Sequence, residues 1–109
     1  MSPKSVIPRE RALQDIEDVI DYYLREAGEA TALAFIDTLE EAFRVIADQS
    51  ASGSPRYAHE LDLAGLRTKL LRQFPYLIFY VEREQHIDVW RILHAQRDIP
   101  AWMQQPDAE

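Results

Sequence analysis

Two helical patterns fill the first half of the chain, and a single glycine separates them. Apolar residues recur at steps of three and four along the segment 8–27, which predicts a helix with one apolar face. A second stripe with the same steps predicts another helix from about Glu29 to Asp48. Pro8 suits a first helical turn, and Gly28 suits the position just after a helix end, so the helices are expected to form a short-linked hairpin. The apolar positions are Leu13, Ile16, Val19, Ile20, Tyr23, Leu24 and Ala27, then Ala32, Ile36, Leu39, Phe43 and Ile46.

The second half of the chain has the pattern of strands. Three runs are strand-like, 66–72, 76–82 and 87–93, and the second is rich in β-branched and aromatic residues. Short links join them, which predicts an antiparallel meander. The segment 49–55 has the composition of a loop, and it connects the two halves inside one domain. A short leading strand at 5–7 is possible. The predicted fold is therefore α+β, with the helical hairpin on one face of a small antiparallel sheet, in a single domain over residues 1–109.

The alternation along the run 76–82 predicts which side of the sheet meets the helices. Leu77, Phe79 and Val81 share one wholly apolar face, which is expected to pack against the helices. Tyr76, Ile78 and Tyr80 share the other, which is expected to be half exposed. Arg67 and Lys69 share a face of the preceding run, and that face is expected to adjoin the tyrosines.

Composition and charge limit the classes of protein. A chain of 109 residues without cysteine has no disulfide, thiolate metal site or cysteine nucleophile, and it fits a reducing cytosol. The start of the chain lacks the apolar run of a secretory signal, and no run approaches the about 20 apolar residues of a membrane span. A cytoplasmic location without membrane contact is expected.

The net charge of −7 is unevenly distributed. Residues 1–54 hold five basic and eleven acidic residues, whereas residues 66–97 hold six basic and three acidic ones. An acidic chain is a poor general binder of nucleic acid, but a locally basic face could attract an acidic partner segment. Acidic residues lying mostly off the helical stripes are expected to be solvated: Asp15, Glu17, Asp18, Asp21, Glu40 and Glu41.

The segment 90–98 gathers a cation, an imidazole and an Arg-Asp pair. General acid–base catalysis would need His94 close to a donor such as Arg67 or Arg91. On a regular strand Arg91 and His94 face opposite sides, so only a bulge or the strand end between them would bring them together. Alternatively, Arg91 bridges to a carboxylate and His94 caps the end of the sheet. The sequence alone assigns no catalytic residue.

The residues after the last strand also have two interpretations. Asp98 can accept hydrogen bonds from backbone N–H groups as a cap before a short helical segment, 99–105. Alternatively, Arg97 recognises a carboxylate of a partner. Aromatic residues dominate binding hot spots, although most of those here can equally pack in the core. They are Tyr22, Tyr23, Tyr57, Tyr76, Tyr80, Trp90 and Trp102.

No metal or cofactor is expected. His59, His86 and His94 are scattered, and no predicted helix carries a histidine pair one turn apart. Phosphate-binding loops, nucleophile elbows and dinucleotide fingerprints are absent from the sequence. The chain is not typical of a metabolic enzyme.

Four segments resemble the ParE branch of the RelE/ParE toxins, the toxic halves of bacterial type II toxin–antitoxin pairs. The segment 12–23 is similar to the first helix of that family, and the segments 65–67, 74–80 and 91–98 match its middle and its closing signature. The resemblance covers roughly residues 7–98. It implies two helices on a twisted antiparallel sheet and a cognate antitoxin, ParD-like or similar, that wraps a segment over the toxin as a hetero-oligomer.

The resemblance also implies a target. ParE-type toxins poison DNA gyrase by binding it, so no catalysis and no direct, specific nucleic-acid binding are expected. RelE-type relatives instead cleave messenger RNA on the ribosome. The acidic balance disfavours that alternative, but Arg67, Lys69, Arg91 and His94 keep it open. A non-toxic module that only binds antitoxin is a third alternative. The residues expected to contact target or antitoxin are Arg67, Lys69, Tyr76, Tyr80, Arg91, His94 and Arg97.

Overall fold

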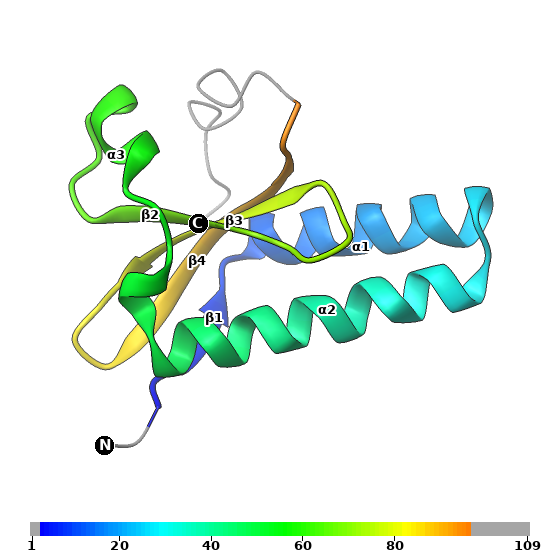
Figure 1. The fold of residues 1–109 in the computed structure, drawn as a ribbon, viewed down its shortest axis with the longest axis horizontal. Helices are drawn as coiled ribbons and strands as arrows, with labels where there is room; N and C mark the ends of the chain where they lie inside the picture. The colour runs from blue at the N-terminus through cyan, green and yellow to red at the C-terminus, as the bar shows by residue number, and fades with distance from the viewer. Residues whose placement is uncertain (1–2, 97–109) are drawn as a thin grey trace.

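The computed structural model describes residues 3–96, which form a helical hairpin packed on a four-stranded sheet (Figure 1). The expected helical segment 99–105, with Arg97, Asp98 and Trp102, lies outside the described residues. None of the helices within residues 3–96 is long and apolar enough to cross a bilayer. The elements are β1 (Ser5–Pro8), α1 (Glu10–Glu26), α2 (Glu29–Asp48), the 3-10 turn η1 (Ser50–Ser52), α3 (Arg56–Glu60), β2 (Leu66–Leu70), β3 (Tyr76–Glu82) and β4 (His86–His94).

The hairpin of α1 and α2 has the predicted boundaries to within two residues, but Pro8, which was expected in the first helical turn, is the last residue of β1, and α1 begins at Glu10. Gly28 adopts φ +98°, a conformation that side chains rarely allow, and nothing lies within 4 Å of where its Cβ would be. The glycine is therefore needed for its backbone conformation and not for lack of space. Its N–H and that of Ala27 both donate to the carbonyl oxygen of Tyr23, which closes the end of α1.

The sheet has the order β1-β4-β3-β2. β2, β3 and β4 form the predicted antiparallel meander, and the leading strand is confirmed as β1. β1 pairs with β4 in parallel, from Ser5 opposite His86 to Pro8 opposite Val89, so the sheet is mixed. The expectation of a wholly antiparallel sheet was wrong at this edge, because the rule for short links does not apply to two strands separated by the whole hairpin.

The predicted facing of β3 was wrong. Ile78 and Tyr80 are fully buried in the core cluster beneath α1 and α2, whereas Phe79 and Val81 lie in a second cluster with Tyr57 of α3. Both faces are covered, because the short helix α3, which the sequence did not predict, packs on the face of Phe79 and Val81, on the side of the sheet away from α1 and α2.

Tyr80 can be buried because the backbone satisfies its hydroxyl group. The hydroxyl donates to the carbonyl oxygen of Ser50 at 2.5 Å and accepts from the N–H of Gly53 at 3.0 Å. Any side chain at position 53 would collide with this hydroxyl, which explains the glycine. A buried phenol with both bonds made costs little to desolvate.

A bulge interrupts the pairing of β3 with β4. Phe79 lies opposite Arg91, but Tyr80 lies opposite Val89, so Trp90 is an extra residue on β4. Such a bulge changes the side on which the following residues lie. It precedes both Arg91 and His94, and therefore sets the positions of both.

Candidate protein interface

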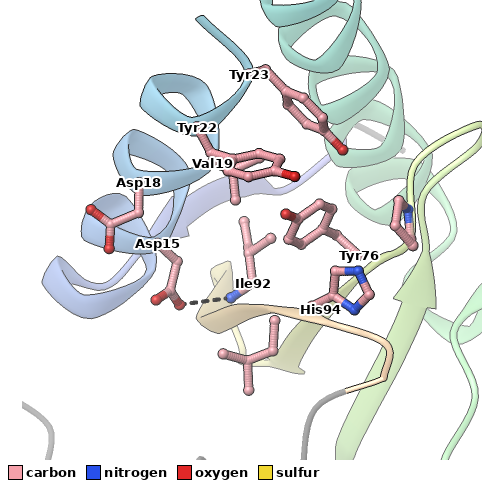
Figure 2. A pocket seen from close by; sticks show the side chains of 10 residues that line it. Asp15, Asp18, Val19, Tyr22, Tyr23, Tyr76, Ile92 and His94 are labelled. Carbon is pink, nitrogen blue, oxygen red and sulfur yellow. Dashed lines mark hydrogen bonds between the residues drawn. The ribbon is translucent and has the colours of Figure 1, made fainter. Parts of the chain in front are cut away.

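A groove of about 490 Å³ lies between α1 and the region where β4 ends and β3 begins (Figure 2). The residues on α1 recur at three- and four-residue steps, so they share one face of the helix. The β4 residues are the last of the strand. The lining residues are Asp15, Asp18, Val19, Tyr22 and Tyr23 from α1, with Pro75, Tyr76, Ile92, Leu93 and His94 from the strands.

Aromatic rings form much of the groove. Tyr22 and Tyr23 have ring centroids 5.4 Å apart at 65°, Tyr23 and Tyr76 lie 6.5 Å apart at 79°, and Tyr76 and His94 lie 5.2 Å apart at 76°. Successive rings are thus edge to face, the favoured arrangement of aromatic pairs. In Figure 2 the hydroxyl groups of the three tyrosines point into the space between α1 and the end of β4.

Tyr23 remains a neutral phenol at physiological pH. Burial, and then the neighbouring Tyr22, raise the pKa of Tyr23 above its ordinary value of 10.0, and a hydrogen bond with Tyr76 opposes them only in part. The groove wall therefore presents uncharged ring faces, which are electron-rich.

A buried ion pair lies beside the groove. Arg91 donates through Nε and Nη2 to the two carboxylate oxygens of Asp15, at 2.8 and 2.9 Å, and the Ile92 N–H donates to Oδ2 at 3.0 Å. The bridge from Arg91 to a carboxylate is confirmed. The expectation that Asp15 is solvated was wrong, since its side chain is only 10% exposed; the other five acids named with it are exposed.

The residues considered for nuclease chemistry do not converge. Arg91 lies opposite Phe79 and His94 lies opposite Tyr76, so the two remain three residues apart on one strand beyond the bulge. His94 Nδ1 accepts from the Gln96 N–H at 3.1 Å, which confirms it as a cap of the sheet end. Arg67, opposite Tyr80 on β2, donates to the carbonyl oxygen of Gly53 at 2.8 Å.

The remaining candidate binding residues differ in accessibility. Tyr76 and His94 are half-buried at the groove, and Lys69 is half-buried on β2 opposite Ile78. Arg67 and Lys69 do share the face of the tyrosines, as predicted. Tyr80 is fully buried and offers no surface to a partner, and Arg97 lies outside the described residues.

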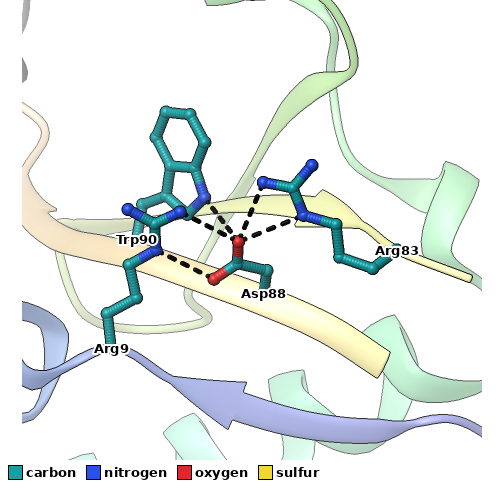
Figure 3. A network of polar contacts seen from close by, with 4 residues as sticks. All are labelled: Arg9, Arg83, Asp88 and Trp90. Carbon is teal, nitrogen blue, oxygen red and sulfur yellow. Dashed lines mark hydrogen bonds and ion pairs between the residues drawn. The ribbon is translucent and has the colours of Figure 1, made fainter. Parts of the chain in front are cut away.

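Sequence reasoning missed a second polar cluster around Asp88 (Figure 3). Its carboxylate accepts from Arg9 at 3.0 and 3.1 Å, from Arg83 at 3.0 and 3.2 Å, and from Trp90 Nε1 at 3.0 Å. The Arg9 guanidinium also lies 4.7 Å from the centre of the Trp90 ring. The sequence did carry a signal for this cluster. Asp88 lies between Ile87 and Val89 in a predicted strand, and a carboxylate that is buried there needs hydrogen-bonding partners.

Within residues 3–96, no group of three or more histidine, cysteine, aspartate or glutamate side chains could hold a metal ion.

The family described as the ParE toxin of the type II toxin–antitoxin system, parDE, matches residues 6–99. The chain belongs to the ParE toxin family. This ParE-family chain also superposes on a chain of the solved chromosomal ParDE TA system from P. aeruginosa, with a TM-score of 0.72 and 20% identity. The match covers 85% of this chain and 97% of the other, and at this identity it shows the shared fold. No curated protein sequence matches the chain significantly.

Proposed function

We propose that this ParE-family toxin arrests growth in the cytoplasm by binding DNA gyrase, and that a cognate antitoxin neutralises it by covering the groove beside α1. Membership of the family supports a toxin with an antitoxin partner. The observation that favours binding over catalysis is the Asp15–Arg91 pair. It holds the guanidinium of Arg91, whose side chain is 6% exposed, inside the protein.

The alternative of a messenger RNA nuclease receives less support. Arg67, Arg91 and His94 each have a structural partner, and the strand pairing keeps Arg91 apart from His94. A nuclease active site instead brings its acid, base and phosphate-binding groups within reach of one substrate atom.

The proposed binding surface for antitoxin or target comprises Tyr76 and His94 at the groove, Lys69 on β2, and Arg97 beyond β4. Tyr76 and His94 have partly exposed rings next to exposed Tyr22, which suits a protein interface. Arg67 contributes by holding the backbone carbonyl group of Gly53, and Arg91 contributes by pairing with the Asp15 carboxylate beside the groove.

A supercoiling assay tests the target. Purified gyrase should lose activity when wild-type toxin is added in excess, and pre-mixing the toxin with its cognate antitoxin should restore that activity. Unchanged supercoiling at a large excess of toxin would overturn the gyrase target.

Transcript mapping separates the target from the nuclease alternative. A gyrase inhibitor should trigger a DNA-damage response when wild type is expressed, and should produce no translation-dependent transcript cuts. Cuts by wild type that His94→Gln abolishes would establish the nuclease instead. Harmless expression combined with tight antitoxin binding would leave only the non-toxic module.

A further inference from the structure

We propose that the groove beside α1 receives one arginine or lysine side chain of the antitoxin, held against the rings of Tyr22 and His94 and attracted by the charge of Asp18 at the rim of the groove. The proposal rests on the antitoxin partner of the proposed function and adds the chemistry of its central contact.

The first observation is the aromatic lining. Three tyrosines and a histidine line one groove, with successive rings inclined at 65° to 79°. Neutral ring faces attract cations, and cages of several rings are a recurrent way to bind them. The phenolic oxygens that point into this space can also accept hydrogen bonds from an ammonium or a guanidinium group.

The second observation is charge. Asp18 lines the rim of the groove one turn before Tyr22 on α1; its exposed carboxylate accepts from Gln14 Nε2 at 2.9 Å and points away from the rings in Figure 2. The hairpin around it, residues 10–48, carries eleven acidic and three basic residues. An acidic partner side chain would be repelled here, whereas a basic one is attracted both by Asp18 and by the field of the hairpin.

The third observation is that the protein's own nearby cation is committed elsewhere. Arg91 is adjacent to groove residue Ile92, but its guanidinium makes two hydrogen bonds to Asp15. Asp15 is thereby neutralised, and Asp18 is left as the acid that a partner would meet.

The fourth observation is shape. A groove of about 490 Å³ accommodates a long side chain, and Val19, Ile92 and Leu93 supply apolar contacts for its methylene stem. Lysine and arginine bury their stems along apolar surface while the charged head contacts polar groups.

The first test uses the full chain and needs no antitoxin. N-acetyl-arginine amide and N-acetyl-citrulline amide have nearly the same shape, but only the first is charged. In an NMR titration the arginine probe should shift the side-chain signals of Tyr22 and His94 in a saturable way, and the citrulline probe should not. Equal shifts from both probes, or none from either, would overturn the proposal.

The second test measures the affinity of the purified antitoxin by calorimetry at low salt. Tyr22→Leu removes a ring but keeps apolar area, and Tyr22 is 48% exposed, so the fold should persist. Tyr22→Leu and Asp18→Asn should each weaken binding about 3- to 30-fold, the range that cation–π contacts and exposed charge pairs span. Asp37→Asn, the same charge change at an exposed position of α2, should change affinity less than twofold.

The outcomes separate the two proposals. If wild type binds the antitoxin and the variants Tyr22→Leu and Asp18→Asn bind it equally well, the proposed cation site is overturned and the proposed function still stands. Tighter binding by Asp18→Asn identifies an acidic or apolar occupant and also overturns it. Wild type that binds no antitoxin overturns the neutralisation step, whereas the probe titration still decides whether the groove binds cations.

Discussion

Strand β4 carries two long-range ion-pair sites that are built in opposite ways. Just after the bulge at Trp90, Arg91 supplies the cation and α1 supplies the acid, Asp15. Before the bulge Asp88 supplies the acid, and Arg9, just before α1, and Arg83, in the turn before β4, supply the cations. Each site connects the N-terminal part of the fold to its last strand.

The two sites differ in burial and in redundancy. Both side chains of the Asp15–Arg91 pair are at most 10% exposed, and each carboxylate oxygen receives a guanidinium hydrogen bond. At the other site Arg9 is 25% and Arg83 45% exposed, so either cation can be hydrated if Asp88 is lost. A buried ion pair is costly to break from one side, whereas an accessible acid with two cationic donors tolerates the loss of one donor.

The largest expected effect is that of Asp15→Ala. It leaves the Arg91 guanidinium and the Ile92 N–H without their acceptor in the interior, so the free energy of unfolding should fall by about 3–5 kcal/mol. Urea denaturation followed by circular dichroism measures this. The double variant Asp15→Leu/Arg91→Met removes both charges and should be clearly more stable than Asp15→Ala. A loss below about 1 kcal/mol for Asp15→Ala would contradict the buried pair.

The sequence predicted the parts of the fold that depend on local periodicity. The stripes of α1 and α2 and the composition of β3 and β4 each lie within one element, and their boundaries agree with the structure to within a residue or two. The brief strand β1 was predicted as a possibility, but its parallel pairing with β4 was not, because the pairing joins residues about 80 positions apart.

The errors concern partners that are distant in sequence. Asp15 lies on α1 where a stripe pattern predicts solvent, and it is buried only because the edge of β4 presents Arg91 and the Ile92 N–H there. Tyr80 was assigned to the open face because of its hydroxyl, whose partners at Ser50 and Gly53 no strand pattern reveals. The structural roles of Arg91 and His94 were predictable, since strand alternation already separated them.

Asp88→Asn should cost less than Asp15→Ala. The amide keeps the shape and can still accept one or two hydrogen bonds, and Arg83 can turn to water, so we expect a loss of about 1–2 kcal/mol. The same denaturation measures it, and Trp90 fluorescence reports on the local change. Arg83→Ala is the matched partial variant and should lose less again. A loss as large as that of Asp15→Ala would remove the contrast between the two sites.

The contribution of Asp88 should also depend on pH. Burial alone would raise the pKa of Asp88, but the hydrogen bonds from Arg9, Trp90 and Arg83 outweigh it and lower the pKa below its ordinary 3.8. Folding therefore favours the charged carboxylate of Asp88. Its contribution to stability is complete above the pKa of this group in the unfolded chain, and it is lost as the pH falls through the lower pKa of the group in the folded protein. The difference in unfolding free energy between wild type and Asp88→Asn should be constant from pH 7 to about 5 and shrink below about 4. A difference that grows with acid would mean that the cluster favours the protonated acid.

The smallest expected effect belongs to a pair with neither burial nor redundancy. In this pair, Nη1 of Arg72, after β2, lies 3.0 Å from Oε1 of Glu41 on α2, and the two side chains are 76% and 50% exposed. Solvent screens this pair and both long side chains lose freedom to form it, so Arg72→Ala should change the unfolding free energy by about 0.5 kcal/mol or less. Raising the salt to about 1 M should abolish even that difference, because the screening length falls to about 3 Å, whereas the loss in Asp15→Ala should persist. A salt-resistant loss in Arg72→Ala would show that the long side chain stabilises the fold through packing rather than charge, and burial would then no longer account for the ranking of the three sites.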